Sequence, residues 1–318
     1  MTIKLNELLD IQESIILMES GYQNNTYITK SLRFLYNTIS ELSRFNELVD
    51  AKIIMLEEMD RVYALGLYNP PTKQPAFWTL LTTVLDTEHQ NTFNEFVHAI
   101  KKHIAEGGVS TLHIERSEFI EAMREYYSIK LVETLKNCPV NFEFVYNEPR
   151  VERLKIIINQ LEQSYSLDLS GSVLEICCGN GMATAALSKL GIRPLCIDND
   201  SYSILEGLVS KVLKPEKTIV ADVTELTDII KGEEFDASIG FMLGDIDEFN
   251  KPLWKEILIQ TIKLTKKGGS LLFTFRTEPE VMFVKDLLEE LATGDVICQS
   301  ETESLYDCWI YIGKKKLV

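Results

Sequence analysis

The sequence predicts two domains, an all-helical domain over residues 1–148 and an α/β domain with a mainly parallel sheet over residues 149–318. Two observations carry this prediction. Apolar residues recur at helical spacing up to about Pro139, and strand-like runs alternate with helical stretches after Pro149. The length of 318 residues agrees with it, because a common domain has about 100–150 residues.

The first half is predicted to be helical because its apolar residues lie three or four positions apart. Leu8, Ile11 and Ile15 follow this spacing, and so do Leu32 and Leu35. Glycine, proline and asparagine would divide the half into separate helices at 21–25, 68–71 and 107–108. Strand alternation is hard to find in this half.

The second half contains seven runs that read as strands. They are residues 172–177, 193–197, 217–221, 235–240, 270–275, 296–300 and 308–313. Helical stretches between the earlier runs predict parallel pairing with crossover helices. Only seven residues separate the last two runs, so we expect these two to pair antiparallel, because a parallel crossover needs a dozen residues or more.

The composition is that of a globular protein, and its charge disfavours several kinds of partner. Apolar residues make up 45% of the chain and charged residues 25%, which excludes fibrous and wholly disordered classes. Lys and Arg number 32 against 48 Asp and Glu, and the formal net charge is −16. An acidic chain gains little affinity from phosphate groups, so nucleic acid and anionic lipid are disfavoured partners.

The chain is expected to be cytoplasmic and to have no membrane contact. No run approaches the ~20 apolar residues that span a bilayer, and the N-terminal residues show no secretory pattern. The six Cys residues include no C-x-x-C pair, so we expect reduced thiols. The histidines also lack the spacing of metal ligands, and we expect no metal site.

The most informative segment is 173–187, which reads as a buried strand, a glycine-containing turn and the start of a helix. In an open α/β sheet, such a turn faces the crevice beyond the carboxyl ends of the strands. Thr184 stands where a dinucleotide fingerprint requires its third glycine, so a nicotinamide cofactor is less favoured. Glu175, four residues before Gly179, is placed to accept hydrogen bonds from an amino-bearing ligand or from the turn.

Acidic residues also end the next two strand-like runs. Asp198 lies 17 residues after Gly181, where a carboxylate can accept the protons of both ribose hydroxyls. Asp222 and Val223 follow the third run. Asp222 can accept a hydrogen bond from an adenine amino group, and Val223 can pack on the adenine ring. A single acid at a strand end is more often a helix cap or a turn residue. Together with Glu175, these acids form an ordered set at three successive strand ends.

With its glycine turn, strand-end acids and terminal antiparallel pair, the segment 149–318 resembles the class I S-adenosylmethionine-dependent methyltransferases. The resemblance implies a Rossmann-like seven-stranded sheet, S-adenosyl-L-methionine as cofactor and methyl transfer as the activity. It also implies that the turn holds the methionine half, Asp198 binds ribose and Asp222 contacts adenine. The expected cofactor-binding residues are Glu175, Cys177, Cys178, Gly179, Asn180, Gly181, Asp198, Asn199, Asp222, Val223 and Phe241. The family usually has glycine at the position of Cys177.

The segment 241–247 follows the fourth strand, where the resembling family places the methyl acceptor. Asp245 and Asp247 are the nearest candidates for a general base, but alignment alone can accelerate displacement from a sulfonium. We therefore assign no base. Phe241 could contact the cofactor or belong to the core.

The methyl acceptor is left open by the sequence, although several features favour a small molecule. The Asn/Asp-Pro-Pro-aromatic motif that resembling enzymes use on nucleic-acid bases is missing from the strand-four segment. The N-terminal domain would form part of the acceptor pocket, a lid or the surface of a homodimer. The alternatives are a protein methyltransferase and a non-catalytic cofactor-binding or interaction protein.

Overall fold

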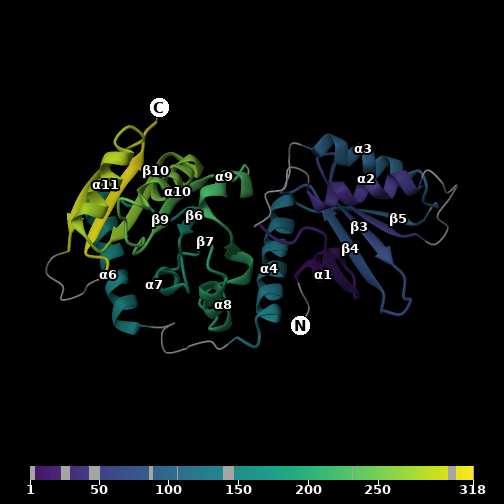
Figure 1. Cartoon of the computed structure of the whole chain (residues 1–318), viewed down its shortest axis with the longest axis horizontal. Coiled ribbons are helices and arrows are strands. Elements are labelled where there is room, and N and C mark those ends of the chain that lie inside the picture. Colours follow the sequence, from purple (N-terminus) through teal and green to yellow (C-terminus); the bar gives the residue numbers. More distant parts are fainter. Residues whose placement is uncertain are drawn as a thin grey trace. The chain divides into compact units, whose positions relative to one another are not determined.

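The computed structural model describes residues 4–22, 29–42, 51–85, 89–105, 107–138, 147–230, 232–299 and 306–317. The chain divides into two compact units, Met1–Tyr127 and Ser128–Val318 (Figure 1). The division falls inside helix α4 (Arg116–Thr134), earlier than the boundary that the sequence predicted between residues 148 and 149. Each unit contains a sheet of its own.

The first unit is an α/β unit, so the prediction of an all-helical N-terminal domain is wrong. Its sheet has five strands in the order β1-β4-β3-β2-β5. The strands are β1 (Ser14–Leu17), β2 (Ile53–Glu58), β3 (Arg61–Asn69), β4 (Phe77–Thr82) and β5 (Val109–His113). β1 is parallel to β4 and β2 is parallel to β5, whereas β2, β3 and β4 pair antiparallel.

Three further helices complete the first unit, α1 (Lys4–Leu9), α2 (Lys30–Leu42) and α3 (Gln90–Lys101). α2 and α3 lie side by side on one face of the sheet (Figure 1). Leu35 of α2 and Phe93 of α3 are fully buried with Leu65 of β3 in one apolar core. The helical spacing of Leu32 and Leu35 therefore predicted a helix that is present.

The strands of the first unit escaped prediction because their buried runs do not alternate. β2 begins with four consecutive buried residues, and β4 ends with five. Periodicity cannot distinguish such a run from a segment of a buried helix. The Met59-Asp60 pair, with φ of 48° and 61°, closes the hairpin between β2 and β3. Ile15, which the spacing assigned to a helix, lies in β1.

The second unit has the Rossmann-like seven-stranded sheet that the sequence predicted. Its strand order is β11-β12-β10-β9-β6-β7-β8. The strands are β6 (Val173–Ile176), β7 (Leu195–Asp198), β8 (Thr218–Val220), β9 (Phe235–Gly240), β10 (Thr265–Phe275), β11 (Ala292–Cys298) and β12 (Trp309–Lys315). β12 is antiparallel to both β10 and β11, which confirms the terminal antiparallel pair. Ser300, the last residue of one predicted strand, lies outside the described residues.

The described helices of this unit are α6 (Glu148–Tyr165), α7 (Met182–Lys189), α8 (Ser201–Val209), α9 (Leu226–Ile229), α10 (Lys251–Leu264) and α11 (Glu278–Leu288), with short 3₁₀ helices η1 (Pro215–Lys217) and η2 (Val223–Glu225). Helix α6 precedes β6, helices α7 to α10 lie between successive parallel strands, and α11 lies between β10 and β11. Asn147 caps α6 by accepting the Arg150 N–H at 3.1 Å. The chain passes from β6 outward to β8 and then returns to β9 beside β6. This reversal is the switch point at which open α/β sheets bind ligands.

The described helices include none with both the length and the apolar character needed to cross a bilayer. All six cysteines lie in described segments and are free thiols.

Candidate functional site

The glycine turn between β6 and α7 has an unusual backbone that leaves one face open. Cys177, Gly179 and Gly181 have φ of 50°, 54° and 84°. Cys177 thus adopts the left-handed conformation, at a cost of roughly 1–2 kcal/mol for a residue with a Cβ. A Cβ at Gly181 would lie 2.8 Å from Leu213 Cδ2, whereas a Cβ at Gly179 would meet nothing within 4 Å. The backbone at Gly179 is therefore open to a ligand.

Asp198 joins the end of β7 to this turn. Its Oδ2 accepts the Gly179 N–H at 2.8 Å, and its Oδ1 accepts the Asp200 N–H at 2.8 Å. A carboxylate has about four acceptor positions, so each oxygen keeps capacity for a further donor such as a hydroxyl group. The side chain is half-buried. Asp198 can therefore hold the turn and contact a ligand at the same time.

Asp222 follows β8 and caps the short helix η2. Its Oδ1 accepts the Thr224 N–H at 2.9 Å and the Thr224 hydroxyl at 2.8 Å, while the neighbouring Val223 is buried. Burial, together with the nearby carboxylates of Asp198 and Asp222, raises the pKa of the Cys177 thiol to about 12. Both carboxylates therefore lie close enough to the turn to act on it electrostatically. The ends of β6, β7 and β8 converge there.

Glu175 lies in the interior and does not bond to the N–H groups of the turn. Its side chain is only 1% exposed, and its Oε2 accepts the Thr184 hydroxyl at 2.7 Å and the Cys196 thiol at 3.6 Å. These bonds tie β6 to α7 and β7. Burial raises the pKa of Glu175 to about 7, although both bonds oppose the shift. Cys178 is also buried, and burial raises the pKa of its thiol well above the usual range.

The other residues expected at the cofactor differ in their surroundings. Asn180 Nδ2 lies 3.5 Å from Glu206 Oε2, and Asn199 is exposed beside Asp198. Phe241 is 7% exposed and packs in the main hydrophobic core of the unit with Ile239. The structure thus brings the turn, Asp198 and Asp222 together, and places Phe241 among core residues.

The two candidate bases after β9 already have partners. Asp245 is exposed, and its Oδ1 lies 3.3 Å from Nη2 of Arg276. Asp247 accepts the N–H groups of Phe249 and Asn250 at 2.9 and 3.0 Å, just before α10 begins. The bonds of Asp247 are those of a turn-forming residue.

Two charged residues near this segment were not selected from the sequence. Arg150 of α6 and the fully buried Asp307 form an ion pair, with 3.2 Å between Nε and Oδ2. They lie 157 positions apart, so no spacing rule could have paired them. The sequence contains one signal for a buried acidic partner. Arg150 and Arg153 lie three residues apart at the start of a capped helix, so both can face the same side.

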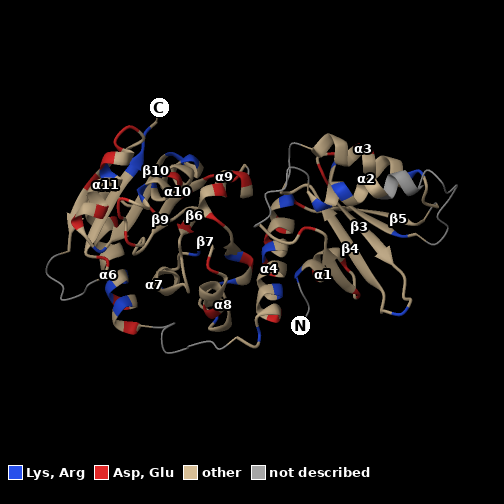
Figure 2. Cartoon of the chain, viewed as in Figure 1, with Lys and Arg blue, Asp and Glu red and all other residues tan. Residues whose placement is uncertain are grey.

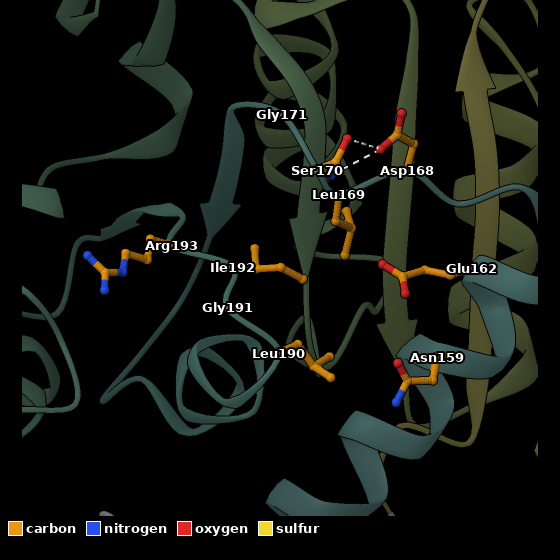
Figure 3. Close-up of a pocket in the computed structure, with 10 residues that line it drawn as sticks. All are labelled: Asn159, Glu162, Asp168, Leu169, Ser170, Gly171, Leu190, Gly191, Ile192 and Arg193. Atoms are coloured by element: carbon orange, nitrogen blue, oxygen red, sulfur yellow. Dashed lines mark hydrogen bonds between the residues drawn. The ribbon is translucent and has the colours of Figure 1, made fainter.

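A cavity of about 500 Å³ lies at the opposite end of the strands (Figure 3). It is bounded by α6 and by the segments that precede β6 and β7, so it is separate from the glycine turn, which follows β6. Its lining residues are Asn159, Glu162, Asp168, Leu169, Ser170, Gly171, Leu190, Gly191, Ile192 and Arg193. Within it, Asp168 Oδ1 accepts the N–H and the hydroxyl of Ser170 at 3.0 and 2.7 Å.

Across the described ranges, no group of three or more His, Cys, Asp or Glu side chains is arranged to hold a metal ion.

No family model matches the sequence, and no curated protein matches it. Solved structures similar to this chain include an rRNA methylase from Streptococcus thermophilus, with 16% identity, a TM-score of 0.39 and coverage of 51% of this chain and 96% of that one. NodS, an N-methyltransferase from Bradyrhizobium japonicum WM9 solved with S-adenosyl-L-homocysteine, has 18% identity and a TM-score of 0.39, with 59% and 96% covered. A ribosomal protein L11 methylase from Lactobacillus delbrueckii subsp. bulgaricus has 14% identity and a TM-score of 0.39, with 54% and 80% covered.

The strand order defines the fold of the second unit. Five parallel strands are followed by an antiparallel terminal pair, with β12 inserted between β10 and β11. This is the Rossmann-like sheet that the resemblance to class I S-adenosylmethionine-dependent methyltransferases implied. The second unit has the fold of that class.

Proposed function

We propose that this chain is an S-adenosylmethionine-dependent methyltransferase whose acceptor is a small molecule. The observation that carries the proposal is the 2.8 Å hydrogen bond from the Gly179 N–H to Asp198 Oδ2. It joins the open glycine turn and a strand-end carboxylate into one site at the switch point of the sheet. The fold of the second unit supports the same function.

Each strand end would contact a different part of the cofactor. Asp198 would accept hydrogen bonds from the ribose hydroxyls, because its carboxylate has further acceptor positions besides those used by the Gly179 and Asp200 N–H groups. Asp222 would accept from the adenine amino group, and Val223 would pack against the ring. The open backbone at Gly179 gives the methionine half room to approach the turn.

When bound, the cofactor supplies a methyl group on a sulfonium. The glycine turn, Asp198 and Asp222 would hold the cofactor, which would supply this methyl group to a lone pair of the acceptor. The chain would contribute alignment of the acceptor and exclusion of water, which can supply much of the acceleration. Asp245 is paired with Arg276 and Asp247 forms a turn, so we assign neither as the base.

The acceptor is proposed to be small mainly on grounds of charge. The formal net charge is −16, and acidic residues occur in both units (Figure 2). Phosphate contacts would therefore add little affinity for nucleic acid. In the described part of the first unit, the large apolar residues that are exposed are Ile16, Tyr36 and Met59. They lie on three separate elements, β1, α2 and the turn between β2 and β3, and a protein acceptor is the alternative that the experiment below separates.

Tritiated methyl transfer tests this function directly. The protein is incubated with methyl-labelled S-adenosylmethionine and with separate nucleic-acid, protein and small-molecule extracts of the native host. We expect label in the small-molecule extract. Label confined to nucleic acid would contradict the proposal, and label in protein would favour a protein acceptor. Cofactor binding without any transfer would favour a non-catalytic cofactor-binding protein.

Methyl transfer is expected to be independent of metal, because displacement from a sulfonium needs no Lewis acid. Labelled transfer should therefore proceed at the same rate after treatment with EDTA. The control is the same treatment followed by added Mg²⁺ or Zn²⁺. A rate that is lost on chelation and restored by either ion would contradict this expectation.

A further inference from the structure

The backbone immediately after β9 is held in a left-handed conformation. Met242 has a φ of 53°, which is uncommon for a residue other than glycine because the Cβ clashes with the backbone in this region. Its N–H donates to the Thr274 hydroxyl at 2.7 Å, and the next N–H, that of Leu243, donates to the Thr274 carbonyl at 3.1 Å. Thr274 of β10 thus accepts hydrogen bonds from two consecutive N–H groups of the segment 241–247.

Asp307 fixes the direction of the Thr274 hydroxyl. That hydroxyl donates to Asp307 Oδ1 at 2.6 Å, and the Asp307 N–H in turn donates to Met242 Sδ at 3.0 Å. A carboxylate accepts only, so the hydroxyl proton points toward Asp307 and a lone pair of the hydroxyl oxygen faces the Met242 N–H. Asp307 and Thr274 are both 0% exposed, so water does not compete for these bonds.

The buried carboxylate is balanced by two guanidinium groups of α6. Arg150 Nε and Arg153 Nη2 lie 3.2 and 3.3 Å from Asp307 Oδ2. Arg150 also stacks on the ring of Tyr306, with 5.3 Å between its Cζ and the ring centroid. A buried charge is tolerated when it is paired and hydrogen-bonded in this way.

The charge of the same Arg150 also acts on Glu175, the buried acid of β6. This charge lowers the pKa of Glu175, which desolvation raises. Arg150 therefore lies within electrostatic range of Glu175 on one side and is paired with Asp307 on the other. The charge of Arg150 thus acts both on Glu175 of β6 and on Asp307, the residue that precedes β12.

We propose that Asp307 is a positioning residue that, through Thr274, holds Met242 and fixes the segment 241–247 at the carboxyl end of β9. The consequence for methyl transfer rests on the proposed function, in which this segment lies beside the acceptor. Nothing in the sequence analysis assigned a role to Asp307, Thr274 or the two arginines.

Thr274→Val tests the hydroxyl, because valine keeps the shape and loses both hydrogen bonds. Amide hydrogen exchange of Met242 is measured, together with the rate of labelled methyl transfer at saturating S-adenosylmethionine. We expect Met242 protection to fall about tenfold or more. We expect the transfer rate to fall by a similar factor, whereas the dissociation constant of the cofactor should stay within about twofold of that of the parent.

Two further variants separate positioning from a general loss of stability. Thr274→Ser keeps the hydroxyl and should restore both readouts. Thr265→Val removes a buried hydroxyl at the other end of β10, where Thr265 bonds to Ser238 and to the Thr261 carbonyl. It should leave Met242 protection and the transfer rate as in the parent. If Thr265→Val reproduces the effect, or if Thr274→Ser does not rescue it, the positioning role is wrong.

Asp307→Asn tests the charge with little change in shape, since asparagine adopts the left-handed φ of 56° found at this position as readily as aspartate. The single amide oxygen would face the two guanidinium groups, which only donate, so the amide nitrogen would face Thr274 and turn its hydroxyl proton toward the Met242 N–H. The variant should therefore loosen Met242 as Thr274→Val does. Unchanged protection would overturn the proposal. If the parent protein binds no S-adenosylmethionine, the proposed function fails, but the exchange measurements still decide whether Asp307 holds the segment.

Discussion

Replacing Asp198 with Ala is expected to raise the dissociation constant for S-adenosylmethionine by about 100-fold or more, measured by isothermal titration calorimetry. The variant would lose the acceptor for the ribose hydroxyls, and a hydrogen bond to a charged group contributes about 1.5–3 kcal/mol. Each ~1.4 kcal/mol changes the dissociation constant tenfold. The change also removes the acceptor of the Gly179 N–H, so the glycine turn would lose its bond to β7.

Asp198→Asn provides a graded comparison, because a carboxamide keeps one acceptor oxygen. Its expected loss of affinity is about tenfold. The matched control is Asp168→Ala, which removes another turn carboxylate that accepts two bonds, at the opposite end of the strands. Its affinity should stay within about twofold of that of the parent. Equal binding by Asp198→Ala and the parent would contradict the assignment of the ribose site.

The second unit was predictable because its signals are local in sequence. β6 consists of four buried residues and runs directly into the glycine turn, so strand, turn and helix are read from one continuous segment. Asp198 and Asp222 each end a short strand, and the parallel sheet brings such ends to one edge. The positions of these two aspartates therefore follow from the order of the strands along the chain. The burial of the Glu175 side chain does not follow from that order.

The sheet of the first unit could not be derived by the same reasoning. Its strands β2 and β4 are buried over most of their length, so their apolar runs fit a buried helix as well as a strand. The turn at Met59 and Asp60 was the available local signal, since two consecutive residues with positive φ are typical of a tight hairpin. Neither residue is glycine, which hid the turn from a composition-based reading.

Partners that are distant in the chain limited the prediction of the site as well. Asp307 meets Arg150 and Thr274 only after α6, β10 and the segment before β12 have assembled. A single Asp just before a strand reads as a turn or surface residue, because aspartate is rarely buried without a partner. Its complete burial is a product of the tertiary structure, and the residues that balance its charge lie on another element.

Glu175 makes the stability of the interior behind the glycine turn depend on pH. Burial raises its pKa from the ordinary 4.5 to about 7 in the folded chain. Between these values the folded state binds a proton that the unfolded state has released, so stability falls as pH rises. The stabilising contribution of the protonated acid is complete below about pH 4.5 and is lost as pH rises through about 7.

Glu175→Gln is therefore expected to gain stability relative to the parent as pH is raised from 5 to 8. The amide is neutral throughout and keeps an oxygen that can accept the Thr184 hydroxyl. The free energy of unfolding of the variant minus that of the parent should increase by about 2–3 kcal/mol over this range, measured by urea denaturation. Glu162→Gln, at an exposed position of α6, should show no such trend. Parallel pH profiles for the Glu175→Gln variant and the parent would contradict the raised pKa, because they would mean that Thr184, Cys196 and the charge of Arg150 together offset the cost of burying the carboxylate.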